Sequence, residues 1–377
     1  MSAPPSVRAA AEDEGAAARA RAWLDAALTL WCAHGQADNG AFYEALDWSL
    51  KPMPQPWVRF RVQARQVHVC ARAALTKRHA AAADHAERGF AFMLRSRKDK
   101  DDAYAARLML DGGGDGAPQL YDQAFALLAC ASMAALGDGR ALKEAERLSA
   151  VLARDFGQPR GFSDRRGPVR RYRQNPHMHL LEACLALYQV SGDARFLARA
   201  DEMVALFHDT FYAPPRPSSP PRLREYFDSA WRPLRTYPLE PGHYFEWVWL
   251  LHGWARAHKK PVPPAAAELF RWAWAHGRGA HGVALHGVAE EGERALPPPY
   301  ARLWQQTEML RACLCEAPQE VAGVFAMLET HWLDTKPLGL WRDAQAHAED
   351  AARPPFVPAS TLYHLWGALA ALAGDEV

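Results

Sequence analysis

The chain lacks the features that would assign it to a membrane or a nucleic acid. It has no uninterrupted apolar run of about 20 residues, the length that a transmembrane helix needs. Its 44 Lys and Arg against 43 Asp and Glu give a formal net charge of +1, without the basic excess of a nucleic-acid-binding protein. The N-terminus is acidic and has no apolar stretch typical of a secretory signal. We therefore expect a cytoplasmic protein without a membrane or nucleic-acid partner.

Cysteine is scarce, at six in 377 residues, and no two cysteines form a CxxC pair. Cys313 and Cys315 have a spacing that points their thiols to different faces of a helix, so we expect free thiols and no metal bound by cysteine. The phosphate-binding GxxxxGK[ST], the nucleophile GxSxG and the zinc-binding HExxH are also absent. These absences favour an activity that uses neither a cofactor nor a metal.

Amphipathic helix is what the chain has in abundance. Apolar residues recur at three- and four-residue spacing, and no stretch alternates strictly enough for a large sheet. The predicted helices are 18–34, 57–76, 80–96, 121–136, 141–156, 176–191, 194–212, 242–258, 264–277, 300–315, 318–332 and 360–373. Residues 1–15 are expected to form a disordered N-terminal tail.

Long and short connections alternate between these helices. The long ones, some resembling short hairpins, precede even-numbered helices and span 97–120, 157–175, 213–241, 278–299 and 333–359. The alternation predicts a single domain, 1–377, that is all-α: an (α/α)6 barrel of six inner and six outer helices with the long loops and hairpins at one end. Free N–H groups of the inner helices would then converge on one mouth and favour hydroxyl-rich or anionic ligands. An open solenoid is the alternative.

Candidate site residues lie at the starts of the even-numbered helices. His243 and Glu246 are three residues apart on one helix face, an arrangement that suits proton transfer, although a surface ion pair has the same spacing. His177 and His179 point in different directions, so they are not expected to chelate one metal. His179 shares a face with Glu182, as a buried structural pair also would.

Other candidates depend more strongly on the barrel. His364 is a lone histidine in an apolar helix, which is usually structural, but it begins the last inner helix. Arg65 sits mid-helix, where burial requires a carboxylate or a ligand oxygen. Tyr121 begins the fourth helix and either binds a ligand or packs. Three tryptophans near these motifs, Trp247, Trp304 and Trp366, offer flat faces to a sugar ring. Asn175 precedes Pro176 as a predicted N-cap.

Six motifs together resemble the N-acylglucosamine 2-epimerase superfamily over nearly the whole chain. They are ARQVH (64–68), YDQAF (121–125), NPHMHLLEA (175–183), PGHYFEW (241–247), RLWQQTE (302–308) and YHLWGAL (363–369). The resemblance implies an (α/α)6 barrel and metal-independent proton transfer beside a sugar carbonyl, through a cis-enediolate. The tenth helix reads LWQQTE and lacks the tryptophan pair of cellobiose 2-epimerases.

The resemblance also implies roles for individual residues. His243 and His364 are similar to the two acid/base histidines, Arg65 to the group that polarises the carbonyl, and Glu246 to a catalytic residue that also holds the substrate. The expected substrate-binding residues are His179, His177, Trp304, Glu308, Tyr121, Trp247 and Asn175. No metal ligand and no cofactor is expected.

The predicted function is a sugar isomerase that interconverts D-mannose and D-fructose. The alternative is a 2-epimerase acting on glucose/mannose, an N-acetylhexosamine or cellobiose. Weaker hypotheses are an inverting glycosidase using Glu246 and Glu308 at roughly 6.5–9.5 Å separation, and a non-catalytic sugar-binding protein. The sequence leaves open a homodimer, and whether Arg170, Arg171 and Arg173 bind a phosphate or sulfonate on the sugar.

Overall fold

The computed structural model describes residues 5–97, 102–167, 171–217, 219–289, 301–345 and 354–375, with the backbone alone at 5–13 and 345. Its α-helices are α1 (Pro5–His34), α2 (Phe60–Leu75), α3 (Ala82–Arg95), α4 (Leu120–Ala135), α5 (Ala141–Asp155), α6 (Gln174–Ser191), α7 (Ala194–Leu206), α8 (Pro241–His258), α9 (Pro264–His276), α10 (Leu303–Glu316), α11 (Val321–Leu328) and α12 (Leu362–Ala373). Short π-helical turns, η1 (Phe207–Phe211) and η4 (Glu329–Leu333), extend α7 and α11.

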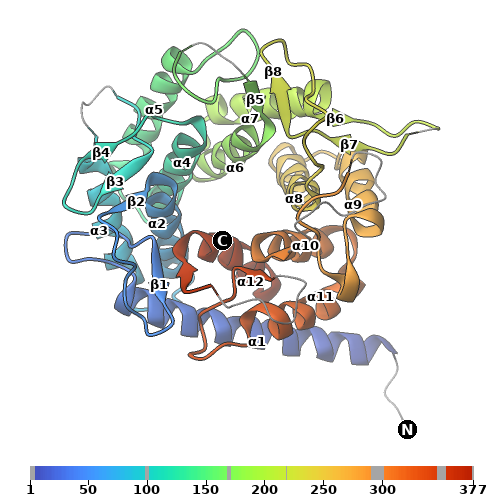
Figure 1. The fold of residues 1–377 in the computed structure, drawn as a ribbon, viewed down its shortest axis with the longest axis horizontal. Coiled ribbons are helices and arrows are strands. Elements are labelled where there is room, and N and C mark those ends of the chain that lie inside the picture. The colour runs from blue at the N-terminus through green and yellow to red at the C-terminus, as the bar shows by residue number, and fades with distance from the viewer. Residues whose placement is uncertain are drawn as a thin grey trace.

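The even-numbered helices form a closed inner ring. Each of α2, α4, α6, α8, α10 and α12 contacts the next, and α12 returns to α2. The odd-numbered helices lie outside this ring, each packed against an inner neighbour (Figure 1). The predicted (α/α)6 barrel is therefore confirmed.

Inner and outer helices differ because of what surrounds them. The sequence of α4, LYDQAFALLACASMAA, is buried on nearly every side, since it touches outer helices on one face and its ring neighbours on the others. The outer helix α5, ALKEAERLSAVLARD, buries a single stripe that includes Leu148 and Leu152 and exposes charged residues elsewhere. Helix periodicity alone thus distinguishes the two rings.

The first helix begins earlier than the sequence pattern predicts. It starts at Pro5, so helix covers most of the segment expected to be a disordered tail. Alanine, the strongest helix former, is frequent there, and its propensity was underestimated because the segment shows no apolar stripe. Residues 1–4 lie outside the described residues.

Short antiparallel strands line up with the starts of the inner helices. They are β1 (Ala45–Asp47), β2 (Trp57–Arg59), β3 (Arg107–Met109), β4 (Gly114–Asp115), β5 (Arg171–Arg173), β6 (Tyr212–Ala213), β7 (Arg222–Leu223), β8 (Tyr226–Asp228), β9 (Ala301–Arg302), β10 (Ala344–Gln345) and β11 (Phe356–Pro358). The pairs are β1 with β11, β2 with β3 with β4, β5 with β8, β6 with β7, and β9 with β10. These are the hairpin-like elements expected in the long connections.

The pairing of β5 with β8 places part of the connection between α7 and α8 beside the start of α6. Tyr172 pairs with Phe227, and the Gln174 N–H donates to the carbonyl of Glu225 at 3.1 Å. Because this pairing directs the chain into the helix, α6 begins at Gln174 and its N-cap is Arg173. The prediction of Asn175 as the N-cap was therefore wrong, and the Asn175 side chain is available for the cavity.

In the described part of the chain, no helix is both long and apolar enough to cross a membrane. All six cysteines are free, as expected, with Cys32 and Cys315 partly buried and the others fully buried.

Candidate active site

A polar cavity of about 300 Å³ opens among the N-terminal ends of the inner helices. Eight of the predicted site residues line it: Arg65, Tyr121, Asn175, His179, His243, Glu246, Trp304 and His364. They come from all six inner helices, so the closed ring is what brings them together. The predicted residues His177, Trp247 and Glu308 do not line it.

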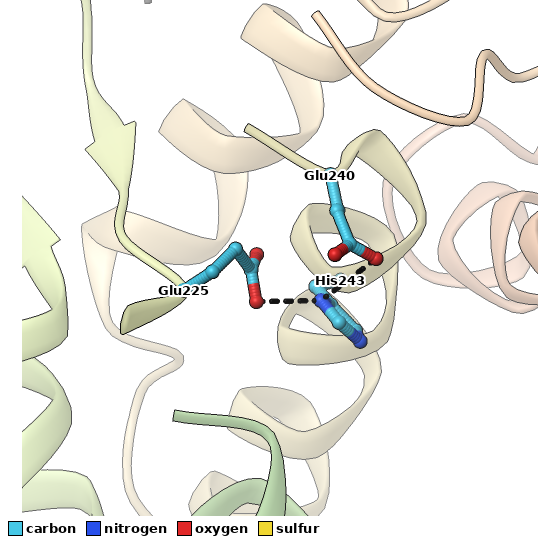
Figure 2. Close-up of side chains that lie close together, drawn as sticks. All are labelled: Glu225, Glu240 and His243. Atoms are coloured by element: carbon cyan, nitrogen blue, oxygen red, sulfur yellow. Dashed lines mark hydrogen bonds and ion pairs between the residues drawn. The ribbon is translucent and has the colours of Figure 1, made fainter. Parts of the chain in front are cut away.

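His243, on the first turn of α8, stands between two carboxylates (Figure 2). Its Nδ1 lies 2.9 Å from Glu225 Oε2 and 3.6 Å from Glu240 Oε2. Burial alone would lower the pKa of His243, but the charges of Glu225 and Glu240 outweigh it and raise that pKa to about 10. The imidazole is therefore a cation at neutral pH.

Asn175 occupies the other side of the same ring. Its amide lies 2.9 Å from Nε2 of His243, and its Oδ1 has no hydrogen-bond partner among the described residues. A cationic imidazole donates from both nitrogens, and a half-turn of the amide presents Oδ1 to Nε2–H. Asn175 is thus suited to hold the His243 cation until a substrate oxygen takes its place.

His364, on α12, has a different environment. Its Nδ1 lies 2.8 Å from Glu308 Oε1, and the other oxygen of Glu308 accepts from Arg311 at 3.1 Å. Burial and the nearby Arg65 cation lower the pKa of His364 well below its ordinary value. A neutral His364 that donates Nδ1–H to Glu308 keeps its Nε2 lone pair free to accept a proton.

Trp304 separates the two histidines. Its ring centroid lies 5.0 Å from that of His243 and 5.8 Å from that of His364. Gly242 permits this approach, because a Cβ there would stand 2.6 Å from the indole and would clash. One cavity therefore holds a cationic and a neutral imidazole beside the same indole ring, an arrangement suited to a proton donor and a proton acceptor.

Arg65 is a buried cation, 5% exposed, on the second turn of α2. Nη2 donates to the Tyr121 hydroxyl at 2.9 Å and Nη1 to the Ser360 carbonyl at 3.2 Å. The rings of Phe125 and Tyr363 flank the guanidinium at 4.1 and 4.8 Å. Arg65 forms no ion pair with a described carboxylate, so its charge is available to a ligand oxygen in the cavity.

His179 is held by a carboxylate on its far side. Nδ1 lies 3.0 Å from Glu182 Oε2, as the i,i+3 spacing predicts, and Glu182 also accepts from the Tyr363 hydroxyl. Burial lowers the pKa of His179, which leaves Nε2 as an acceptor 3.8 Å from Glu246. Burial and Glu308 raise the pKa of Glu246 well above its usual value, so this carboxyl can donate a hydrogen bond to a sugar oxygen.

The predicted pairing of His243 with Glu246 is wrong. Their helix face is shared, but Glu246 lies one turn deeper, against His179 and the Glu308–His364 pair. Glu225 and Glu240 take the place beside His243 because the β5–β8 pairing and the turn before α8 carry them there.

His177 is a structural residue. Its Nδ1 donates to the Arg173 carbonyl at 2.8 Å, and its Nε2 accepts from the Phe162 N–H at 3.0 Å. Burial lowers its pKa to about 4, so the ring stays neutral while it connects α6 to the preceding loop. Two residues from His179, it points away from the cavity, as helical geometry requires.

Three other residues predicted to contact the sugar also lie outside the cavity. Trp247 is fully buried, donates from Nε1 to Gln174 Oε1 at 2.8 Å and packs on Phe207. Glu308 lies behind His364, where it orients that ring and does not face a sugar. Trp366 is buried, 3% exposed, and lines a separate cavity. That cavity shares no lining residue with the candidate active site.

Sequence reasoning missed several residues that line the cavity. They are Arg59, Arg61, Gln119, Glu225, Tyr226, Glu240, Ser360 and Thr361. Most lie in strands or turns directly before an inner helix, a position that the barrel prediction itself could have singled out. Of the three basic residues considered for an anion, Arg173 lines the cavity, Arg171 is exposed and bonded to Tyr237, and Arg170 lies outside the described residues.

Two groups of metal-ligating type occur among the described residues: Glu225, Glu240 and His243, and Glu246, Glu308 and His364. In each group the histidine Nδ1 is already hydrogen-bonded to a carboxylate. Histidine–carboxylate pairing accounts for both groups as parts of a proton-transfer site.

Comparisons with known proteins show which family the chain resembles in sequence and fold. The family model for N-acylglucosamine 2-epimerase matches residues 40–368. The chain is 34% identical over 366 residues to a mannose-6-phosphate isomerase of Rhizobium meliloti (strain 1021), covering 91% of this chain and 93% of the relative. It is 32% identical to a D-mannose isomerase of Thermobifida fusca, covering 70% of each. A crystal structure of D-mannose isomerase superimposes over 100% of both chains with a TM-score of 0.85 at 18% identity, which shows a shared fold.

The barrel and these relatives define the class: the protein is an enzyme that isomerises or epimerises sugars. The family match covers most of the chain, and with it the chain belongs to the N-acylglucosamine 2-epimerase family.

Proposed function

We propose that this enzyme interconverts D-mannose and D-fructose by moving a proton between C2 and C1 of the open-chain sugar, without a metal. The observation that carries the proposal is the pair of histidines in one cavity, with His243 cationic, His364 neutral and Arg65 beside them. Such a pair provides a base and an acid at the same pH.

The reaction begins at C2 of mannose. Nε2 of His364 takes the C2 proton, and the electrons of the C–H bond form a C1–C2 double bond while the carbonyl oxygen becomes an enediolate oxygen. Arg65 offers that oxygen a cation without a competing carboxylate. His243, held as a cation by Glu225, supplies a proton to a sugar oxygen.

The second half returns a proton to carbon. His364 delivers its proton to C1, neutral His243 takes the proton of the C2 hydroxyl and becomes a cation again, and the C2 carbonyl of fructose forms. Glu308 supports both halves because it holds Nδ1–H and so keeps Nε2 directed at the substrate. A base positioned this way contributes on the order of 10²–10⁴-fold to the rate.

The names of two relatives support the choice of an isomerase of the mannose series, since both are named for mannose or mannose-6-phosphate isomerisation. A 2-epimerase is the second candidate. The observation in its favour is the His243 cation, a second proton donor in the same cavity, which would return a proton to C2.

The inverting glycosidase is disfavoured by geometry. It would need Glu246 and Glu308 on either side of a bond at roughly 6.5–9.5 Å. Here their oxygens and the His364 nitrogen lie within 4.8 Å of one another, and Glu308 does not line the cavity.

The test is incubation of the enzyme with D-mannose in D2O containing EDTA, followed by proton NMR. We expect fructose, with deuterium from solvent at C1 or C2. Glucose in place of fructose would select the 2-epimerase, and dependence on an added divalent metal would contradict metal-free proton transfer. No product and no loss of the C2 proton signal would exclude D-mannose as a substrate.

A further inference from the structure

The residues at the N-caps of the inner helices form a ring around the cavity mouth. They are Arg59 before α2, Gln119 before α4, Arg173 before α6, Glu240 before α8, Arg302 before α10 and Thr361 before α12. All six line the cavity. Three alternate positions are arginines, and each is paired with a carboxylate: Arg59 with Glu44, Arg173 with Asp164 and Arg302 with Asp343.

Positive charge is concentrated on one half of this mouth. The α8 side holds the carboxylates Glu225 and Glu240 beside His243. The opposite half is formed by the neighbouring helices α2, α4 and α6 (Figure 1). There Arg61 and Arg173 line the cavity.

Both arginines are anchored from behind and open towards the cavity. Arg61 is bonded through Nη1 to the buried carboxylate of Asp122 at 3.1 Å, and Arg173 through Nε to Asp164. Among the described residues, no hydrogen bond engages Nη2 of Arg61 or either Nη of Arg173. The two side chains are 23% and 27% exposed, so a ligand entering from solvent can reach them.

The distance from the reacting end suits a hexose. Arg61 and Arg65 are four residues apart on α2, one above the other with a rise of roughly 6 Å. Both contact the ring of Tyr121, at 5.4 and 5.8 Å. If Arg65 binds the oxygen at C1, Arg61 lies about one helical turn nearer the mouth, where the other end of an extended hexose chain would be.

We propose that Arg61 and Arg173 bind a phosphate group on the terminal carbon of the sugar, so that the preferred substrates are the hexose phosphate esters of the mannose–fructose pair. The proposal rests on the proposed function and names its substrate class. Guanidinium N–H groups pair well with phosphate oxygens, and the N-termini of the surrounding helices add positive potential. Free hexoses would react through the same histidines but would not use this pair.

The experiment compares kcat/KM for D-mannose 6-phosphate and D-mannose in wild type, R61Q and R173Q. We expect the wild type to prefer the ester by roughly tenfold or more, and each substitution to remove about tenfold of that preference. R61K keeps the charge that neutralises Asp122 and should retain part of the preference. The control is R302Q, a cap arginine on the opposite half of the mouth, which should change both substrates by the same factor.

Two results would overturn the proposal: equal kcat/KM for the two sugars in the wild type, or a preference that survives in both R61Q and R173Q. Adding inorganic phosphate to the reaction with D-mannose tests whether the arginines bind a phosphate attached to the sugar or a free phosphate ion. Activation of D-mannose to the level of the ester would show a separate anion and would also overturn it.

The anion site can be tested even if neither sugar reacts, a result that would contradict the proposed function alone. Calorimetric titration then compares the binding of D-mannose 6-phosphate and D-mannose. At least tenfold tighter binding of the ester, lost in R61Q and R173Q, supports the site. Equal binding excludes it.

Discussion

His243 and His364 start from the same local arrangement and end in opposite charge states. Each lies near the start of an inner helix, faces the cavity beside Trp304 and binds a glutamate through Nδ1. A second carboxylate, Glu240, stands near His243, whereas the Arg65 cation acts on His364. Beside His243 the charges of Glu225 and Glu240 together outweigh burial and raise the pKa, whereas at His364 burial and the Arg65 cation lower it, so one ring is suited to be the acid and the other the base.

Removing either ring should produce the largest effect. H364Q deletes the base and should lower kcat by about 10²–10⁴-fold, with loss of C2 proton exchange into D2O. H243Q should also lose turnover, but His364 can still take the C2 proton, so exchange should fall less than product formation. Rates of isomerisation and of deuterium exchange, measured on the same samples by NMR, check this. Equal loss of exchange in both variants would contradict the division of roles.

Changing the carboxylate beside His243 should move the pH dependence. The pKa of about 10 lies above the value of roughly 6.5 for an unpaired histidine, so the paired cation persists through neutral pH. The contribution of the His243–carboxylate pair to stability and to activity is complete below about pH 6.5, and it is lost as the pH rises through about 10. E225Q removes the nearest carboxylate, so the alkaline fall of kcat/KM should move to lower pH.

E308Q is the matched control for this shift. It removes the carboxylate that orients His364, so kcat should fall by one to two orders of magnitude, as for other residues that orient a functional histidine. The pH at which kcat/KM falls on the alkaline side should be the same as in the wild type. An alkaline fall that moves equally in E225Q and E308Q would show that neither glutamate acts specifically on its own histidine.

The smallest effect on activity is expected at His177. H177L leaves the Phe162 N–H and the Arg173 carbonyl without their partners, which should lower the free energy of unfolding by about 1–3 kcal/mol. Because the ring is neutral, with a folded pKa of about 4, its contribution is present above about pH 6.5 and lost as the pH falls towards 4. Urea unfolding should show a lower free energy of unfolding, and steady-state kinetics should show little change in kcat/KM. A large loss of kcat in a folded variant would indicate that His177 takes part in catalysis.

Much of the fold could be predicted from periodicity. The helix boundaries agree with the structure to within a few residues through most of the chain, as at α8, expected from 242 and observed from Pro241. The main departure is α1, where a polar, alanine-rich segment carries no apolar stripe to mark it as helix.

The candidate site was predictable where residues occupy the starts of inner helices, as Arg65, His179, His243 and His364 do. It was not predictable where an insertion supplies the group. Glu225 comes from the strand region between α7 and α8, 18 residues before His243, and nothing in its neighbours marks it. Arg59 was not predicted for a similar reason, since it reaches the rim of the cavity only because β2 leads directly into α2.

By itself the sequence determined the number and order of the helices, the division into an inner and an outer ring, and the family, because periodicity and short motifs are local properties. Only the tertiary structure decided which carboxylate pairs with which histidine, that His177, Trp247 and Glu308 stay outside the cavity, and where the arginines of the mouth gather. Charge state depends on every group within a few ångströms, and those groups come from inner helices and an insertion that lie far apart in the chain.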